Sequence, residues 1–139
     1  MRHILNLEIV TPIGSKYAGK VTEVTAPGSL GEMGVLPGHI PILTVLEIGA
    51  LSYTDVNEDS PRKLAIGGGY LEVNADKLIV LTETAEFSGE IDIERATEAK
   101  ARAEDALNED EVGSATYAKR LRSLQRAKTR LTVATGEAN

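Results

Sequence analysis

The hydrophobic pattern of this 139-residue chain changes its period once, around residues 86–96. Before this stretch, apolar and polar residues alternate in short runs, which is typical of β-strands; after it, apolar residues recur every three or four positions, as in helices. Ser88 and Gly89 lie at the change, and because glycine tolerates many backbone angles, we expect a swivel there. Asp92 is expected to be the N-cap of the helix that follows. The pattern therefore predicts an α+β protein.

The segment up to residue 88 contains many short apolar runs separated by turn signals, which is typical of a β-sandwich or a flattened barrel. The expected strands are residues 5–10, 21–25, 42–46, 49–54, 63–66, 70–73 and 77–81. Residues 27–41 contain three prolines and four glycines, so we expect a series of tight turns there. The triple glycine at residues 67–69 indicates a strand bulge or a close backbone approach rather than a phosphate-binding loop.

The segment after residue 89 is expected to form an antiparallel helical hairpin with a loop at residues 108–113. The first helix, about residues 93–107, carries a stripe of alanines: Ala96, Ala99, Ala103 and Ala106. Ser114 is the expected N-cap of the second helix, which runs to about residue 134. Its expected seam comprises Tyr117, Leu121, Leu124 and Leu131, and the arginines Arg122, Arg126 and Arg130 lie on roughly the opposite side. Burial of one alanine methyl group contributes only about 0.8 kcal/mol, so we expect the two helices to be held together weakly.

The charge and composition of the chain exclude several function classes. The net charge is −6, yet residues 114–135 contain six Lys/Arg and no acid. An acidic body argues against general nucleic-acid binding, and the basic helix needs an anionic partner or solvent. With no cysteine and two histidines, the chain has no thiolate nucleophile and no Cys- or His-rich metal site. Because it lacks a signal-peptide core and a run of about 20 apolar residues, we expect a soluble, cytosol-facing protein that can dock on a membrane complex.

Three stretches, in order, resemble the epsilon subunit of F-type ATP synthases: GVLPGHIP at residues 34–41, GGYLEV at residues 68–73 and IDIERA at residues 91–96. The resemblance extends from the first strand to the last helix. It implies a ten-stranded β-sandwich at residues 1–88 and a regulatory helical hairpin at residues 89–139. It also implies a non-catalytic subunit of the rotor's central stalk, monomeric when isolated, that binds the gamma subunit and the membrane ring of c subunits. The location implied is the cytoplasmic face of the bacterial plasma membrane.

The resemblance further implies that the hairpin either lies folded on the sandwich or extends toward the acidic alpha and beta subunits, where it inhibits ATP hydrolysis. In family members that bind ATP, the nucleotide favours the folded state, so ATP would be a regulatory ligand here and not a required cofactor. The residues that match their binding pattern are Glu86, Ile91, Asp92, Arg95, Ala96, Arg126 and Arg130. Guanidinium groups suit phosphate because they offer paired donors with a permanent charge. The alternative is that the arginines form a solvated basic face. Glu90 is expected to place a repulsive charge near the triphosphate.

The contacts implied for other subunits fall on a loop and on the basic helix. In the family, the loop that holds Glu32 and His39 faces gamma and the rotor ring, although local residues alone favour a turn histidine with a hydrogen bond nearby. Arg120 and Arg122 would meet the acidic catalytic subunits. The alternative function is a free-standing ATP-binding sensor whose hairpin closes on the nucleotide. An enzyme is disfavoured because the sequence offers no nucleophile, base and orienting group in combination.

Overall fold

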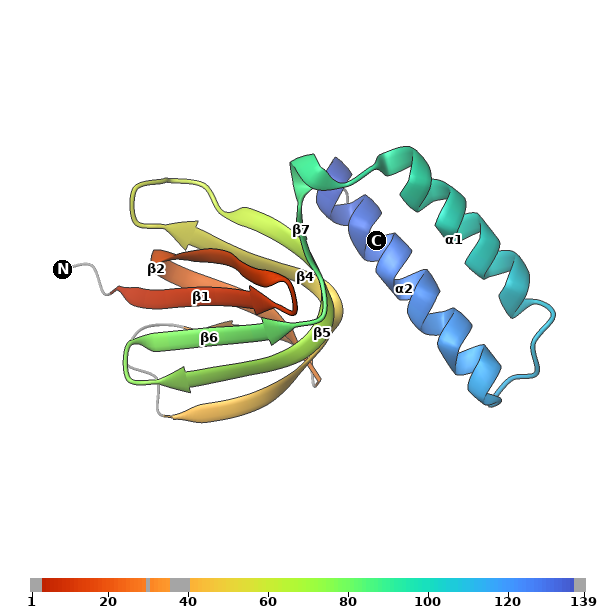
Figure 1. The fold of residues 1–139 in the computed structure, drawn as a ribbon, viewed down its shortest axis with the longest axis horizontal. Helices are drawn as coiled ribbons and strands as arrows, with labels where there is room; N and C mark the ends of the chain where they lie inside the picture. Colours follow the sequence, from red (N-terminus) through yellow and green to blue (C-terminus); the bar gives the residue numbers. More distant parts are fainter. Residues whose placement is uncertain (1–3, 30, 36–40, 137–139) are drawn as a thin grey trace.

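The computed structural model describes residues 4–29, 31–35 and 41–136, and it shows a β-sandwich followed by a helical hairpin (Figure 1). Within these residues the strands are β1 (Leu5–Thr11), β2 (Gly14–Gly28), β3 (Gly31–Val35), β4 (Ile42–Asp55), β5 (Arg62–Asn74), β6 (Lys77–Thr82) and β7 (Ala85–Phe87). The chain continues through the 3₁₀ turn η1 (Ser88–Glu90) into α1 (Ile93–Leu107) and α2 (Ala115–Thr135). The expected α+β order is therefore confirmed.

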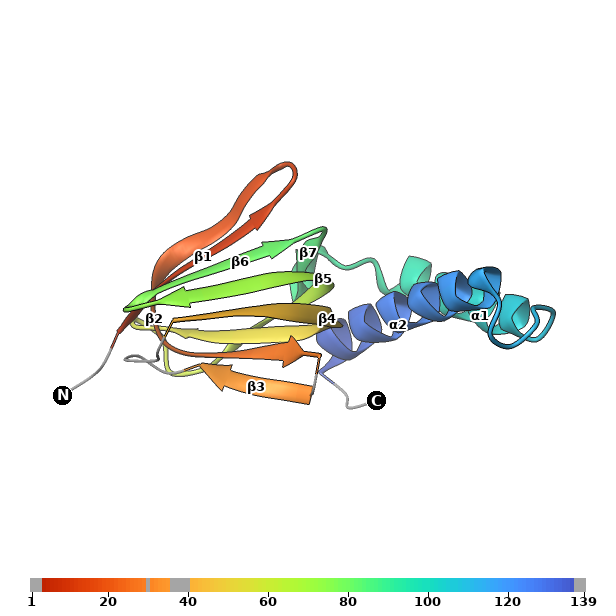
Figure 2. The ribbon, with the colours of Figure 1, turned by 90° about the horizontal axis from the view of Figure 1, so that it is seen from below.

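Five of the strands close into a flattened barrel. Their order is β1-β6-β5-β4-β2, and β2 pairs again with β1. The closure depends on β2, which pairs with β1 through residues 14–21 and with β4 and β3 through residues 21–28. β1 and β6 run parallel, whereas the other pairs are antiparallel. The helical hairpin projects from one end of this sandwich (Figure 2).

The expected number of ten strands is wrong for the described residues, which contain seven. Runs that the pattern separates are continuous: residues 42–46 and 49–54 both belong to β4, and residues 63–66 and 70–73 both belong to β5. The pairing of these two strands keeps one register from Ile42↔Val73 to Tyr53↔Arg62 and passes through the breaks in the pattern. Residues 31–35, expected to form turns, instead add β3 to the edge of β2.

Gly69, the last residue of the triple glycine, lies against the backbone of β6. A Cβ atom on Gly69 would lie 1.9 Å from the carbonyl oxygen of Leu81, and the φ angle of Gly69 is 143°. The buried hydroxyl of Thr82 donates a hydrogen bond to the carbonyl of Gly68 at 2.6 Å. The expected close backbone approach is thus confirmed, and it leaves no room for a side chain.

The main core lies entirely within the strands. In β1, Leu5, Leu7 and Ile9 are buried while Glu8 is exposed, as the alternation predicts. All the residues of the large cluster lie between residues 5 and 87. A second, small cluster joins the sandwich to the helices, and it comprises Ala50, Ala65, Ile91, Val133 and Ala134. Most of the apolar burial is therefore independent of the hairpin.

A chain that ends after Ser88 should consequently fold without the hairpin. We expect a cooperative thermal transition in circular dichroism, because this chain retains every residue of the large cluster. The boundary between residues 1–88 and 89–139 rests on this expectation. A chain of residues 1–88 that melts without a cooperative transition would show that the boundary is misplaced.

Both helices begin where the sequence predicts. The carboxylate of Asp92 accepts a hydrogen bond from the backbone N–H of Arg95 at 3.1 Å, and the hydroxyl of Ser114 accepts one from Tyr117 at 3.1 Å. Each side chain satisfies an amide that the first turn leaves without a partner, which stabilises the helix by about 1 kcal/mol. The predicted N-caps are confirmed, and the two helices pack as an antiparallel hairpin (Figure 1).

The buried face of α2 differs from the expected leucine seam. Of the four predicted residues only Leu124 is buried, and Leu121 is exposed. The buried residues of α2 are Leu124, Ala127, Thr129 and Val133. The difference arises because α2 packs on the alanine stripe of α1 and, near its end, on β4 and β5. Small side chains let the backbones approach closely at both contacts.

Candidate functional site

A charged cavity of about 310 Å³ lies where the end of the sandwich meets α1 and α2. Its volume is at the lower end of the range for small-molecule sites. The lining residues are Glu86, Glu90, Asp92, Arg95, Ala96, Ala99, Arg102 and Arg130. Three carboxylates and three guanidinium groups thus surround one space. The cavity offers donors for an anion and acceptors for hydroxyl or amino groups.

An ion pair across the cavity connects the sandwich to the second helix. The Nε atom of Arg130 on α2 donates to Oε1 of Glu86 on β7 at 2.6 Å. Each side chain is 31% exposed, so solvent screens the pair and we expect it to contribute about 1 kcal/mol at most. A ligand that binds Arg130 must share this guanidinium with Glu86 or displace it.

The first turn of α1 forms a second wall of the cavity. Arg95 is exposed, and Asp92 keeps its carboxylate beside the start of the helix, where it receives the amide of Arg95. Ala96 is buried, and because its side chain is one methyl group, the floor between the helices stays open. The structure therefore brings together five of the seven predicted binding residues: Glu86, Asp92, Arg95, Ala96 and Arg130.

The other two predicted residues lie outside the lining of this cavity. Ile91 is buried against Ala65 of the sandwich and Val133 of α2, so its side chain packs between the two parts of the protein and does not face the cavity. Arg126 is half-buried, and its Nη2 atom donates to the hydroxyl of Ser123 at 3.1 Å on its own helix. A phosphate contact by Arg126 would require this guanidinium to turn away from Ser123.

Sequence reasoning missed Arg102 and Ala99 as lining residues of the cavity. A signal for both was present, because Ala99 lies three residues after Ala96 and Arg102 lies seven after Arg95. Residues at these spacings share one face of a helix. A helical wheel of α1 drawn from Arg95 would have included both.

Glu90 differs from its expected role as an uncompensated negative charge. Its Oε2 atom accepts a hydrogen bond from the ammonium of Lys16 at 2.5 Å, and its Oε1 atom accepts one from the backbone N–H of Phe87 at 2.9 Å. Lys16, and then this N–H, hold the pKa of Glu90 below its usual range. Because Lys16 neutralises the carboxylate, the expected repulsion of a triphosphate loses its physical basis.

The residues predicted to contact other subunits are dispersed. Glu32 is exposed on β3, whereas His39 lies outside the described residues. On α2, Arg122 is exposed, and the Nε atom of Arg120 lies 3.5 Å from a carboxylate oxygen of Asp110 in the loop between the helices. The structure thus leaves Glu32 and Arg122 open to solvent and ties Arg120 loosely to its own hairpin.

An exposed apolar patch covers the outer face of the sandwich, and sequence reasoning missed it. This surface, here called the apolar patch, consists of Leu43, Val45, Tyr70 and Leu81. Cross-strand pairing of Val45 with Tyr70 and of Tyr70 with Leu81 makes the patch continuous over β4, β5 and β6. Tyr70 is 54% exposed. Contiguous exposed apolar surface marks an interaction site. The signal was the nearly unbroken apolar runs at residues 42–46 and 77–81, which fill both faces of a strand.

These features define a class of protein: a β-sandwich with an apolar outer face, joined through a charged cavity to a helical hairpin. The chain belongs to the ATP synthase delta/epsilon chain family. The model of the family's beta-sandwich domain matches residues 4–88, and the model of its long alpha-helix domain matches residues 90–135.

Individual relatives agree with this assignment. An ATP synthase epsilon chain of Trichlorobacter lovleyi is 53% identical over 107 residues, which cover 77% of this chain and 76% of that protein. One of Geotalea daltonii is 46% identical over 134 residues, 96% of each chain. A chain of the Euglena gracilis mitochondrial ATP synthase, solved as OSCP/F1/c-ring, has a TM-score of 0.82 and 23% identity, with 95% of this chain and 81% of that chain covered. At this identity the likeness shows the fold alone. In the described part of the chain, no helix is long and apolar enough to cross a membrane.

Proposed function

We propose that this chain is a non-catalytic subunit of the central stalk of an F-type ATP synthase, where it binds the gamma subunit and the ring of c subunits. Curated relatives named ATP synthase epsilon chain support this, as does the similar fold of a chain in an F1/c-ring assembly. The subunit would then lie peripherally on the cytoplasmic face of the bacterial plasma membrane. Its role there is to couple rotation of the ring to ATP synthesis.

The apolar patch supports a permanent protein partner. A free-standing sensor would leave Leu43, Val45, Tyr70 and Leu81 in water, whereas a stalk subunit covers them. Aromatic side chains at the centre of such a patch contribute much of the binding energy of an interface. Tyr70 lies between Val45 and Leu81 in the pairing, so it is the expected centre of the contact with gamma. This feature favours the stalk subunit over the sensor.

In this proposal the hairpin is a regulatory element that restrains ATP hydrolysis, and its weak contact with the sandwich supports that role. Its contact with the sandwich is small, because three of the five residues in the joining cluster are alanines. A contact of this size is worth a few kcal/mol, so its equilibrium with an extended state can be shifted easily. In the extended state, Arg120 and Arg122 would meet the acidic face of the catalytic subunits, where charge complementarity sets the partner.

We propose that the charged cavity binds ATP as a regulatory ligand. Arg95 and Arg130 are suited to the phosphates, and the carboxylates of Glu86 and Asp92 can accept hydrogen bonds from the ribose hydroxyls or the adenine amino group. A nucleotide there would touch the sandwich, α1 and α2 at once. It would stabilise the folded hairpin by the difference between its affinities for the folded and extended states.

Replacement of Arg130 by alanine should weaken ATP binding about tenfold or more, because a charged hydrogen bond contributes about 1.5–3 kcal/mol. Isothermal titration of the full chain with ATP measures this directly. The matched control is Arg122→Ala, which removes an exposed guanidinium from the same helix outside the cavity. The control should bind ATP as the unaltered chain does. If the unaltered chain gives no heat at millimolar ATP, the proposed ATP site is wrong, and the arginines form a solvated basic face.

A further inference from the structure

Lys16 occupies a special position in β2. Ile9 of β1 pairs with Tyr17, but the next residue, Val10, pairs with Ser15, so Lys16 is the extra residue of a β-bulge. A bulge bends the strand and redirects the side chain of the extra residue. Here the redirected side chain leads to the hinge between the two parts of the protein, where its ammonium meets Glu90.

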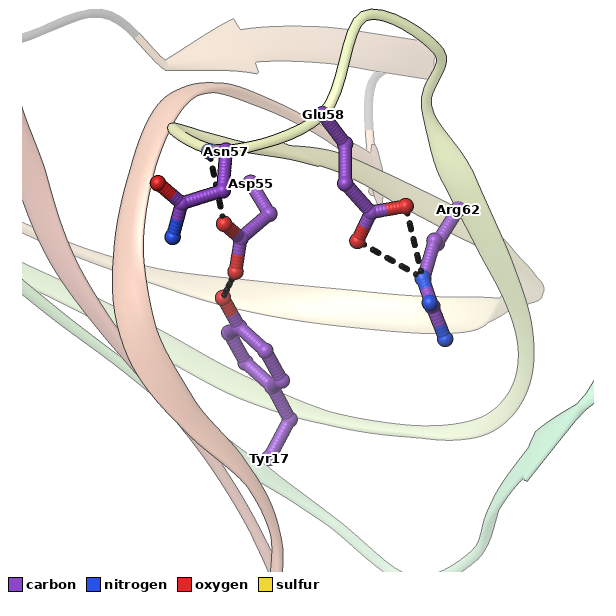
Figure 3. A network of polar contacts seen from close by, with 5 residues as sticks. All are labelled: Tyr17, Asp55, Asn57, Glu58 and Arg62. Atoms are coloured by element: carbon purple, nitrogen blue, oxygen red, sulfur yellow. Dashed lines mark hydrogen bonds and ion pairs between the residues drawn. The ribbon is translucent and has the colours of Figure 1, made fainter.

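The residue after Lys16 is held firmly by the sandwich. The ring of Tyr17 packs against that of Tyr53 with centroids 4.2 Å apart. Its hydroxyl donates to Oδ2 of Asp55 at 2.8 Å, as Figure 3 shows. Asp55 also accepts from the backbone N–H of Asn57 at 2.9 Å. This N–H, and then Tyr17, hold the pKa of Asp55 below its usual range, so the acceptor stays ionised. The sandwich therefore holds the backbone beside Lys16 through contacts that do not involve Lys16 itself.

Lys16 fastens the 3₁₀ turn η1 to the sandwich. Its ammonium pairs with one oxygen of Glu90 and lies 5.7 Å from the centroid of the Phe87 ring, while the other oxygen of Glu90 receives the amide of Phe87. The Phe87 ring in turn meets Tyr53 edge-on at 6.5 Å between centroids. Strand β7, η1 and the bulge of β2 are thus tied together by one carboxylate.

The backbone after η1 is extended at two residues. Ile91 has a φ angle of −84° and a ψ angle of 126°, and Asp92 has a φ angle of −82° and a ψ angle of 102°. They connect η1 to α1, and Asp92 is exposed. Ile91 contacts the sandwich through Ala65, in the small cluster that it shares with Val133 of α2. Once this cluster separates and the ion pair between Arg130 and Glu86 opens, backbone rotation at these two residues can move the helices.

We propose that Lys16 is a positioning residue of the hinge: through Glu90 it holds η1 on the sandwich, so that the hairpin pivots at Ile91–Asp92. The expected swivel at Ser88–Gly89 is then part of the anchored side. The inference deepens the proposed function, on which it rests for the purpose of the movement. It specifies which residues stay with the stalk and which move.

Amide hydrogen exchange of the full chain tests the anchor in the absence of nucleotide and of other subunits. Lys16→Met should speed exchange at Phe87 and Ile91, the amides bonded to Glu90 and Ser88, about two- to fivefold at low salt. Glu90→Gln should do the same at Ile91. Lys16→Glu combined with Glu90→Lys should restore the slow rate at Ile91 but not at Phe87, because a lysine at position 90 offers no acceptor to the amide of Phe87. The matched control is Lys20→Met, an exposed lysine of the same strand that forms no ion pair among the described residues. If the amides of Phe87 and Ile91 exchange as slowly in Lys16→Met and Glu90→Gln as in the unaltered chain, Lys16 does not anchor η1.

A cross-link tests the position of the pivot. Because the chain has no cysteine, Lys16→Cys with Glu90→Cys supplies the only two thiols, and a short bifunctional reagent can join them. With η1 permanently fastened, exchange in the part of α2 near Val133 should be within about twofold of the rate without the reagent. Slowing of tenfold or more would show that opening needs movement at Ser88–Gly89 and would overturn the pivot. Neither readout involves ATP or gamma, so the hinge and the proposed function can fail separately.

Discussion

Gly69→Ala should destabilise the sandwich more than any other single-methyl addition to the described glycines. The added Cβ would lie 1.9 Å from the carbonyl oxygen of Leu81, and the obstacle is the backbone of a neighbouring strand, which cannot rotate away. The φ angle of 143° adds strain for any residue with a side chain. We expect a loss of about 3 kcal/mol or more in the free energy of unfolding, measured by urea denaturation followed with circular dichroism.

Gly34→Ala is the matched control for this substitution. Gly34 also lies in a strand, but nothing lies within 4 Å of the position of an added Cβ. This variant should be as stable as the unaltered chain or slightly more stable, because alanine has less conformational freedom to lose on folding. Similar stabilities for the two variants would mean that β5 and β6 do not approach as closely as described.

Tyr70→Glu should abolish assembly with the gamma subunit while leaving the sandwich folded. The charge would fall at the centre of the apolar patch, between Val45 and Leu81, where a partner must exclude water. Loss of a central aromatic contact typically costs 2 kcal/mol or more, and a buried unpaired carboxylate adds to it, so we expect binding about 100-fold weaker or worse. Co-purification and titration with the gamma subunit measure the effect.

Lys20→Glu provides the control for the patch, because it also adds an acid to an exposed position of the barrel, outside the patch. It should bind gamma normally. Since Tyr70 is 54% exposed, Tyr70→Glu should keep the thermal transition of the unaltered chain. Normal binding by a folded Tyr70→Glu chain would contradict the assignment of the patch to gamma and would reopen the sensor alternative.

The bounds and N-caps of the two helices could be predicted almost residue by residue, because their signals are local. A cap residue, an alanine stripe and a loop fix α1 and α2, and each depends on neighbours within a few positions. The strand count could not be predicted in this way. Whether a polar or glycine-containing interval ends a strand depends on pairing with a distant partner, as in the continuous register of β4 and β5.

The candidate site shows the same division between local and distant information. The motif at residues 91–96 placed Asp92, Arg95 and Ala96 on one wall of the cavity, and Arg102 could have been added from its spacing. Lys16 could not have been associated with Glu90, since 74 positions separate them and the contact depends on a bulge in a different strand. A helical wheel also misjudged the seam of α2, because that helix packs on two neighbours in different directions.

The parallel pairing of β1 with β6 has a consequence for the order in which the protein folds during synthesis. The barrel cannot close until residues 77–81 have left the ribosome and joined residues 6–10, so its closure must wait for most of the sandwich. The helices need no such wait, since each turn forms with residues already beside it. We therefore expect the emerging chain to stay open for some 80 residues and then close within a short interval. The anchored half would be complete while the movable half is still being translated, which lets a waiting subunit capture the sandwich first.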